Sequence, residues 1–426
     1  MCRMCARNTD SSQLSQAMPE KKMKFCPVDS FLQNNQLDCV SQIMGYHPQY
    51  LESFLKTQQQ LLHGDGPLPF DYRHYIGVMA AARHQCDYLV KQQTTEFVLA
   101  GGDEAWLKGL DYIPQKLRNL YEVNKLLAHR PWMITKDHIE KLTRGQDNWS
   151  LSEVMHALIL LAHFHSLCSF VSGCDIRDEE IEETSTSTSS NNNVQMLNCN
   201  NSADVGIAAL MERMKKLTEE SKDQPSQEEM LKRFEKVETQ SLELTLDVAH
   251  PSPRVELLKY VEDSGFVYED FAKRGCESEK PTFRAQDFSW EDHGFSLANR
   301  LYSGIGNLLE DKFRVAYNLT YYTMGHNTDV DTTSFRRAIW NYIHCMYGIR
   351  HDDYNYGEVN QLLERNLKAY IKTVTCYPER TTKKDIESVM REFLHSEKVH
   401  VNLMLFEARL QGELLYALRA VNNYLT

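Results

Sequence analysis

Two charged residues near the end of the sequence stand among apolar and aromatic neighbours in segments of helical pattern. Arg336 lies in residues 333–347 (TSFRRAIWNYIHCMY), and Glu397 lies in residues 395–406 (HSEKVHVNLMLF). A fixed cation and a fixed anion beside apolar surface can hold a zwitterion by its carboxylate and its ammonium at once. The pair therefore predicts a site that binds a free amino acid, which is a prediction about binding and not about catalysis.

A second candidate for chemistry is the thiol of Cys86 in the sequence RHQCDY. On a continuous helix, Arg83 would lie one turn before Cys86 and Gln93 two turns after it on the same face, whereas Tyr88 would point away. A nearby positive charge lowers the pKa of a thiol and makes it a better nucleophile. The alternative is that Cys86 is a small buried residue in an alanine-rich packing face, as free cysteines commonly are.

Carboxylate and histidine residues also recur at a spacing that di-iron helical bundles use, Glu-x-x-His. The pairs are Glu153/His156, Glu392/His395 and Glu397/His400. With 59 acidic residues and 16 histidines in 426 positions, roughly two acidic pairs of this spacing arise by chance. The sequence therefore predicts no metal site and no cofactor.

An acidic, aromatic turn is expected just after Gly348, with Asp352, Asp353 and Tyr354 in the sequence HDDYNY. The following helical segment carries Arg365, Lys368 and Lys372 three and four residues apart, which is the spacing of one helix face. Both segments could be ordinary solvated surface. Tyrosine and paired carboxylates are also common in recognition surfaces, so the turn and the basic stripe together predict a docking site for a protein partner.

The elements that position these residues are expected to be helices, because apolar residues recur at helical spacing and no segment alternates with period two. The fold class predicted is all-α. Pro48 suits the first turn of one helix, and glycines end others. The expected helices cover residues 48–62, 72–99, 107–127, 136–142, 151–173, 206–220, 227–239, 308–324, 333–347, 357–373, 383–394 and 396–424.

The chain is too long for one ordinary core, so two domains are expected. We predict a disordered tail over residues 1–26, a helical domain over 27–174, a mostly disordered acidic linker over 175–284 and a second helical domain over 285–426. Residues 179–193 (EEIEETSTSTSSNNN) have almost nothing to bury, which is typical of disorder. Between residues 175 and 250 there are 17 acidic and 8 basic side chains, which accounts for most of the net charge of -12.

Composition also limits the class of protein. Clustered lysine and arginine are missing, so no nucleic-acid partner is expected. The first residues, MCRMCARNTDSSQ, lack the apolar core of a secretory signal, and eleven irregularly spaced cysteines fit reduced thiols, so an intracellular protein is predicted. Residues 151–171 are apolar enough for a membrane span, but three histidines and a capping box at Ser150 and Glu153 favour a buried helix and no span.

Six segments, in this order, resemble the sestrin family: residues 71–89 (DYRHYIGVMAAARHQCDYL), 127–132 (LAHRPW), 290–294 (WEDHG), 336–345 (RRAIWNYIHC), 352–363 (DDYNYGEVNQLL) and 395–403 (HSEKVHVNL). The resemblance covers both expected domains and leaves out the tail and the linker. It implies two similar all-helical domains of the AhpD alkylhydroperoxidase type. It further implies a cytoplasmic, stress-responsive protein, with a nuclear location left open, that binds GATOR complex 2 and restrains the TOR growth pathway until free leucine is bound.

The resemblance also assigns roles to residues. Arg336 matches the residue that holds the leucine carboxylate, and Glu397 matches the one that holds the ammonium. The remaining leucine-site residues that it implies are Thr320, Tyr321, Thr323, Thr332, Phe335 and Met390. The surface toward GATOR complex 2 matches Asp352, Asp353, Tyr354, Arg365, Lys368 and Lys372, and the redox site matches Cys86 and Tyr88.

Two departures from the family pattern affect these expectations. Met390 stands where vertebrate sestrins have a tryptophan on the pocket floor, and a flexible thioether gives less rigid contact area, so weaker or broader amino-acid binding is expected. Gln93 stands where the family's proton-relay site has histidine, and glutamine exchanges no proton near neutral pH. A leucine sensor is therefore the leading hypothesis, and a Cys86-dependent alkylhydroperoxide reductase is the alternative.

Overall fold

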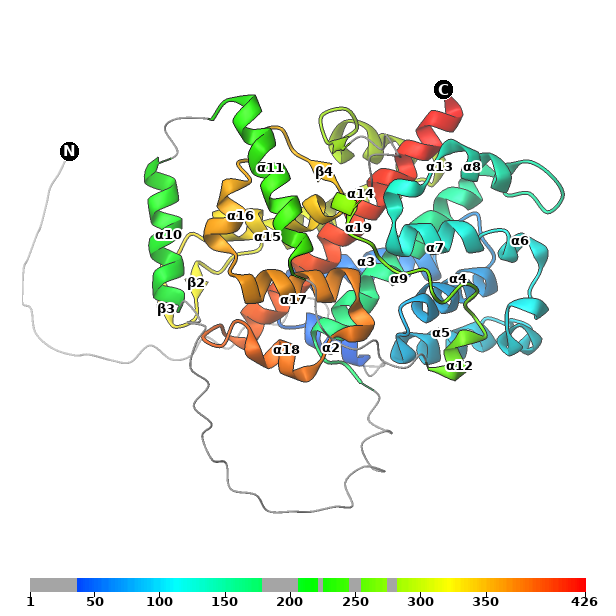
Figure 1. Ribbon diagram of the computed structural model, residues 1–426. Coiled ribbons are helices and arrows are strands. Elements are labelled where there is room, and N and C mark those ends of the chain that lie inside the picture. Colours follow the sequence, from blue (N-terminus) through cyan, green and yellow to red (C-terminus); the bar gives the residue numbers. More distant parts are fainter. Residues whose placement is uncertain (1–36, 178–205, 221–224, 245–253, 274–281) are drawn as a thin grey trace, which may run out of the picture. The chain divides into compact units, whose positions relative to one another are not determined.

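The computed structural model describes residues 37–177, 206–220, 225–244, 254–273 and 282–426 (Figure 1). These residues are helical almost throughout, and the strands among them are four two-residue segments, so the predicted all-α class is confirmed. Residues Asp38–Thr426 form one compact unit. The expected tail over residues 1–26 and the stretch 179–193 lie outside the described residues.

The first part of the chain, up to the gap at residue 178, builds one continuous series of helices. Three short 3₁₀ turns interrupt it: η1 (Glu104–Lys108), η2 (Leu110–Tyr112) and η3 (Pro131–Met133). Its α-helices are α2 (Cys39–Met44), α3 (Pro48–Leu62), α4 (Phe70–Arg83), α5 (Asp87–Leu99), α6 (Gln115–Arg118), α7 (Tyr121–His129), α8 (Lys136–Thr143) and α9 (Leu151–Gly173).

The second part begins with α10 (Ile207–Glu220), α11 (Gln227–Leu242), α12 (Val255–Leu258) and η5 (Phe271–Lys273). It ends on the long helix α19 (His395–Leu425). Between them lie β1 (Phe283–Arg284), η6 (Trp290–Gly294), α13 (Phe295–Leu301), α14 (Ile305–Asn318), β2 (Thr323–Met324), β3 (Asn327–Thr328), α15 (Thr333–Met346), β4 (Ile349–Arg350), α16 (Gly357–Leu362), α17 (Arg365–Cys376), η7 (Pro378–Arg380) and α18 (Lys383–Ser388).

Helix α9 is the apolar centre of this arrangement, and α19 packs along it. The Ser150 hydroxyl accepts from the Glu153 backbone N–H and the Glu153 carboxylate accepts from the Ser150 N–H, which forms the predicted capping box. Among the described residues, α9 is the one helix long and apolar enough to cross a membrane, and its apolar stretch is buried inside the compact unit. It is therefore placed as a core helix.

Several expected helices are interrupted, and the first interruption changes the interpretation of Cys86. The single helix predicted over residues 72–99 is wrong, because the chain turns at His84–Cys86, where Gln85 has a φ of 52°. The Arg83 guanidinium donates to the backbone carbonyls of Glu262 and Phe266 at 2.9 and 2.6 Å. The expected common face of Arg83, Cys86 and Gln93 therefore does not exist.

Four other expected helices are also interrupted or end early. The helix predicted over 107–127 is divided into η1, η2, α6 and α7, and the one over 357–373 is divided between α16 and α17. The helix predicted over 308–324 ends at Asn318, after which β2 and β3 form a small antiparallel hairpin. The helix predicted over 383–394 ends at Ser388.

Part of the expected disordered linker is ordered and packed. The two helices predicted at residues 206–220 and 227–239 are confirmed as α10 and α11; α10 packs on α16, and α11 packs on α15 and α16. The Lys372 ammonium holds this region in place, because it donates to the Ser241 carbonyl at 2.7 Å and pairs with Asp270 at 2.6 Å. Arg365 donates to the Glu243 carbonyl at 3.3 Å. The acidic segment thus meets two residues of the predicted basic stripe.

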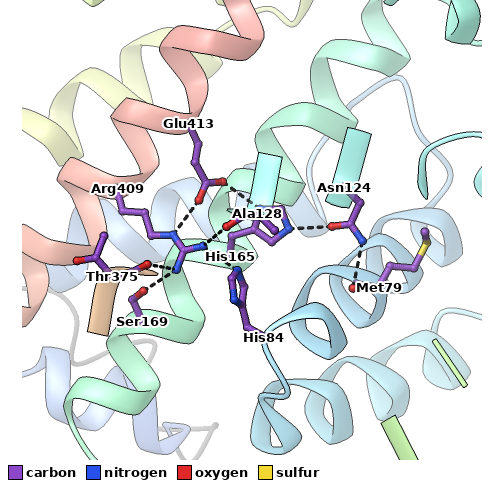
Figure 2. Close-up of polar contacts among 9 residues, drawn as sticks. All are labelled: Met79, His84, Asn124, Ala128, His165, Ser169, Thr375, Arg409 and Glu413. Atoms are coloured by element: carbon purple, nitrogen blue, oxygen red, sulfur yellow. Dashed lines mark hydrogen bonds and ion pairs between the residues drawn. The ribbon is translucent and has the colours of Figure 1, made fainter. Parts of the chain in front are cut away.

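A buried polar cluster joins α19 to the helices of the first part (Figure 2). The Arg409 guanidinium donates to Glu413, Ser169 and the carbonyls of Thr375 and Ala128 at 2.7–3.1 Å, and one of its nitrogens lies 2.7 Å from His84 Nε2. The other Glu413 oxygen lies 2.9 Å from His165 Nδ1. His165 Nε2 reaches Asn124, which donates to the Met79 carbonyl. Each residue of this cluster makes at least one of these contacts, and His84 Nδ1 is left without a hydrogen-bond partner among the described residues.

Candidate functional site

Arg336 lies at the start of α15, where its guanidinium is buried with 6% of the residue exposed. It donates to the hydroxyls of Thr332 and Thr333 at 3.1 Å each, and to the backbone carbonyl of Tyr317. Among the described residues no carboxylate lies within ion-pair distance of it. Burial lowers the pKa of Arg336, and Tyr317 and Asp331 act in the opposite direction. The cation is therefore desolvated and bonded only to neutral oxygens.

Glu397 lies in the first turn of α19, where acidic side chains suit the unpaired backbone N–H groups. Its carboxylate accepts from the Leu394 N–H at 2.9 Å, from the Gly325 N–H at 3.0 and 2.9 Å, and from the Thr323 hydroxyl at 3.3 Å. This anion also has no positively charged partner among the described residues. It ties the hairpin of β2 and β3 to α19.

Gly325 is required at that hairpin. Its φ is +60°, and a Cβ atom there would lie 2.5 Å from Ile207 Cδ1 and 2.8 Å from the Glu392 carbonyl oxygen. The residue opens the two-residue turn between Met324 and Asn327, a position that favours glycine. The turn therefore brings the Gly325 N–H within hydrogen-bonding distance of Glu397. A side chain at position 325 would displace this N–H.

Arg336 and Glu397 line the same cavity, as the sequence predicts for a zwitterion site. The space open to the centres of water-sized spheres is about 40 Å³, which is room for a few water molecules. Its wall includes the other residues implied for this site apart from Met390, namely Thr320, Tyr321, Thr323, Thr332 and Phe335. The remaining lining consists of His47, Leu319, Met324, Phe393, His400, Val401 and Met404.

His47 is a site residue that the sequence does not reveal. It precedes α3, yet its ring lies against the segment 319–332: Nδ1 is 3.1 Å from the Tyr321 hydroxyl and Nε2 is 2.7 Å from the Ser396 carbonyl. The rings of His47 and Tyr321 stack at 5.7 Å. Burial lowers the pKa of His47, partly offset by the Ser396 carbonyl, so the ring is neutral at physiological pH. No local pattern around Pro48 indicates this contact.

Met390 lies outside the cavity that holds Arg336 and Glu397. It adopts a φ of 50° and lines a neighbouring apolar cavity with Ile207, Leu210 and Leu367. Phe393 contributes to both cavities and packs on Phe335 with 5.9 Å between ring centroids. In this structure the apolar wall nearest the charged pair therefore comes from Phe393, Phe335 and Met404.

The acidic turn and the basic stripe are only partly exposed. Asp352 binds Arg284 and Arg350 at 2.6 and 2.7 Å; burial alone would raise its pKa, but these hydrogen bonds hold the pKa of Asp352 below its ordinary value. Tyr354 is 4% exposed and Lys372 is 2% exposed, so neither presents its polar tip to a partner here. Lys368 is half-buried and donates to Asn360. Asp353 and Arg365 are the exposed members.

The predicted redox residues line a different and larger cavity. Cys86 and Tyr88 share it with His84 and Glu379, and its volume is about 440 Å³. Burial raises the pKa of Tyr88. Gln93 is not part of this wall, because it is buried and hydrogen-bonded to His74 Nδ1 at 2.9 Å. Gln93, which stands at the family's proton-relay position, is therefore bonded to His74 and does not line the cavity of the Cys86 thiol.

Fold and sites together define an all-helical protein with a small cavity between a buried cation and a partly buried anion, and a separate thiol cavity. A family model described as PA26 p53-induced protein (sestrin) matches residues 6–425. Sestrin-3 of Mus musculus is 53% identical, over 94% of this chain and 87% of that protein. Sestrin-1 of Xenopus laevis is 51% identical, over 97% of this chain and 90% of that protein. The sestrin homolog of Drosophila melanogaster is 48% identical, over 92% of this chain and 93% of that protein.

The chain belongs to the sestrin family, which confirms the resemblance that its motifs carry. It is accordingly a stress-induced regulator of the sestrin type.

Proposed function

We propose that this protein is a cytoplasmic sensor of free leucine that binds GATOR complex 2 and thereby restrains TOR signalling. The observation that carries the proposal is the cavity between Arg336, which is buried, and Glu397, which is partly buried, two charges of opposite sign without a charged partner among the described residues. An ion of either sign in such a place is costly unless a counter-charge meets it. A zwitterion supplies both counter-charges at once, and Phe335, Phe393 and Met404 supply apolar contact for an aliphatic side chain.

Ligand entry requires the segment 319–332 to move, because about 40 Å³ does not hold an amino acid. Its side-chain bonds to the rest of the site are few: Tyr321 to His47, Gly325 and Thr323 to Glu397, and Thr332 to Arg336. A bound ammonium would compete with the Gly325 N–H for the Glu397 carboxylate, and a bound carboxylate would compete with the Tyr317 carbonyl for Arg336. The segment thus acts as a lid whose own contacts are exchanged for ligand contacts.

A series of contacts between the amino-acid cavity and the acidic turn supports the proposal that ligand binding affects the binding of GATOR complex 2. Arg337, next to Arg336 on α15, donates to Glu358 at 2.9 Å and lies 5.5 Å above the Tyr354 ring. Together with Tyr317 and Asp353 it lines a further cavity of about 350 Å³. The Tyr317 backbone carbonyl also accepts a hydrogen bond from Arg336. A ligand that moves Arg336 would therefore shift Tyr317, and with it the wall against which the acidic turn packs.

Isothermal titration of the full chain with leucine tests the sensor. We expect saturable heat from the parent, and a loss of affinity of about 10- to 100-fold for Arg336→Gln and for Glu397→Gln, as for hydrogen bonds to charged groups. Glu387→Gln, an exposed carboxylate of α18, is the matched control and should bind as the parent does. No heat at millimolar leucine, or undiminished binding by a folded Glu397→Gln chain, would sink the proposal.

A further inference from the structure

The cavity of about 350 Å³ beside the acidic turn runs along one face of α14. Glu310, Phe313 and Tyr317 line it over two helical turns, which is a length of about 10 Å. Trp340 of α15 also lines it, and its ring centroid lies 5.4 Å from that of Tyr317. A volume of this size is ordinary for a small-molecule site. The cavity is therefore elongated, with aromatic side chains along its wall.

One end of this cavity is acidic. Glu310 accepts a hydrogen bond from the Trp290 indole N–H at 2.6 Å, and this donor carries no charge. Glu291, the residue after Trp290, is exposed and lines the same end of the wall. Neither carboxylate forms an ion pair with another of the described residues. This end therefore presents two negative charges that a ligand can meet.

The other end is marked by Asp353 in the acidic turn. The ring of its neighbour Tyr354 lies 5.5 Å from the Arg337 guanidinium in the first turn of α15. Arg336, the residue before Arg337, donates to the Tyr317 carbonyl, so this end of the cavity lies two turns of α14 away from Glu310. Asp353 is exposed and has no ion-pair partner in the described part of the chain. Tyr354 is buried, and its hydroxyl lacks a hydrogen-bond partner among the described residues.

The positive charges in the wall are already bound to carboxylates outside it. Arg314 donates to Asp311 at 2.7 Å, and Arg337 donates to both Glu358 oxygens at 2.9 and 3.0 Å. Neither of these carboxylates lines the cavity. Burial lowers the pKa of His351, which also lines it, so this ring adds no charge near neutral pH. The charges left for a ligand are therefore negative, and they stand at both ends.

We propose that this cavity binds an aliphatic chain with an ammonium group at each end, that is, a diamine or polyamine. One ammonium lies at Glu310 and Glu291, and the other lies at Asp353. The methylenes between them lie along Phe313 and Trp340. Ammonium groups donate charge-assisted hydrogen bonds to carboxylates, and the chain beside them is attracted to aromatic rings. The proposal rests on neither the amino-acid cavity nor the partner surface.

Isothermal titration of the full chain with heptamethylenediamine tests this site, at an ionic strength of about 0.15 M, which screens exposed charges. We expect saturable heat from the parent. Heptylamine has the same chain and only one ammonium, so it should bind at least about 10-fold more weakly.

Two variants each remove the charge at one end of the cavity. Glu310→Gln keeps an oxygen for the Trp290 indole, and Asp353→Asn changes an exposed side chain, so both should fold. Each should weaken diamine binding about 10-fold, as for the loss of a hydrogen bond to a charged group. Glu387→Gln, an exposed carboxylate of α18 outside the cavity, is the matched control and should bind the diamine as the parent does.

Three results would overturn the proposal: no saturable heat from the parent at millimolar diamine, equal affinity for the diamine and heptylamine, or undiminished binding by both cavity variants. The first two need only the parent, so the test stands even where a variant folds poorly. Equal weakening in Glu387→Gln and Glu310→Gln would assign the heat to the acidic surface of the whole chain, and it counts against the site in the same way.

Discussion

At the scale of single residues, the amino-acid cavity is defined by a buried cation, Arg336, and a partly buried anion, Glu397, that do not pair with each other. Arg336 and Glu397 each form hydrogen bonds with hydroxyls and backbone groups, which lowers the cost of desolvating Arg336 without neutralising either charge. Sequence patterns could identify both residues, because each is a charge in an apolar helical segment. They could not identify His47, since its role depends on a contact across 274 positions of the chain.

The hydrogen bond between Tyr321 and His47 should govern how long a ligand stays. Tyr321→Phe removes only the hydroxyl that meets His47 Nδ1 at 3.1 Å, a loss of about 1 kcal/mol. We expect the dissociation rate of leucine to rise about five-fold, measured by stopped-flow competition. Tyr322→Phe is the control, because Tyr322 is 61% exposed and does not line the cavity. Equal dissociation rates in the two variants would show that the lid is held by other contacts.

Glu379 should make stability depend on pH. Its pKa is raised from 4.5 to about 7, so the folded chain holds a proton between these values that the unfolded chain has released. Its contribution to stability is present below pH 4.5 and is lost as the pH rises through about 7. Glu379→Gln stays neutral, and above pH 7 it should exceed the parent in free energy of unfolding by up to about 3 kcal/mol.

Denaturant unfolding between pH 5 and 8 measures this difference. The gap between Glu379→Gln and the parent should shrink as the pH falls, whereas Glu387→Gln should follow the parent throughout. A gap that is constant with pH would mean that Glu379 titrates normally in the folded chain.

At the scale of elements, the local sequence predicts where helices form. It does not predict where a helix is interrupted. Pro48 before an apolar face and the capping box at Ser150 mark the starts of α3 and α9, and both were predictable for that reason. The turn at His84–Cys86 has no such signal, because apolar spacing continues through it. What stabilises it is distant: Arg83 donates to backbone carbonyls of residues 262, 263 and 266. The position of Cys86 in a turn could therefore not be predicted from the spacing of apolar residues.

The hairpin between β2 and β3 gives a test of lid geometry. Gly325→Ala introduces both a strained φ of +60° and a Cβ atom 2.5 Å from Ile207, and we expect it to destabilise the chain by about 3 kcal/mol and to weaken leucine binding. Gly304→Ala carries the same strain at a φ of +82° with no atom within 4 Å, so it should cost only about 1 kcal/mol. Thermal and denaturant unfolding of both variants separate the clash from the strain. Equal losses would remove the clash from the explanation.

At the scale of the compact unit Asp38–Thr426, α19 connects functions that the sequence divides between two halves. Its first turn carries Glu397 of the amino-acid cavity, and its middle carries Arg409 and Glu413 of the polar cluster with α7 and α9 (Figure 2). Sequence patterns predict each helix but give no partner for these buried charges, since pairing is a property of tertiary packing. The expected domain boundaries at residues 174 and 285 stay predictions.

Removing one charge from this cluster should destabilise the whole unit. Glu413→Gln leaves the fully buried Arg409 guanidinium without its carboxylate and weakens the bond to His165, for an expected loss of about 3–5 kcal/mol. The melting temperature reports it, with Glu387→Gln as the exposed control. A Glu413→Gln chain that melts with the parent would show that the carbonyls of Ala128 and Thr375 suffice for Arg409.

The same cluster sets an order of events during protein synthesis. The ribosome completes α4, α7 and α9 more than two hundred residues before it adds Arg409 and Glu413, so His84 and His165 emerge long before their partners on α19 exist. Domains that close their own cores can fold while the chain is still growing, but these helices would bury polar groups without partners if they closed early. We therefore expect the nascent first half to keep His84 and His165 in contact with water until the final helix has been translated.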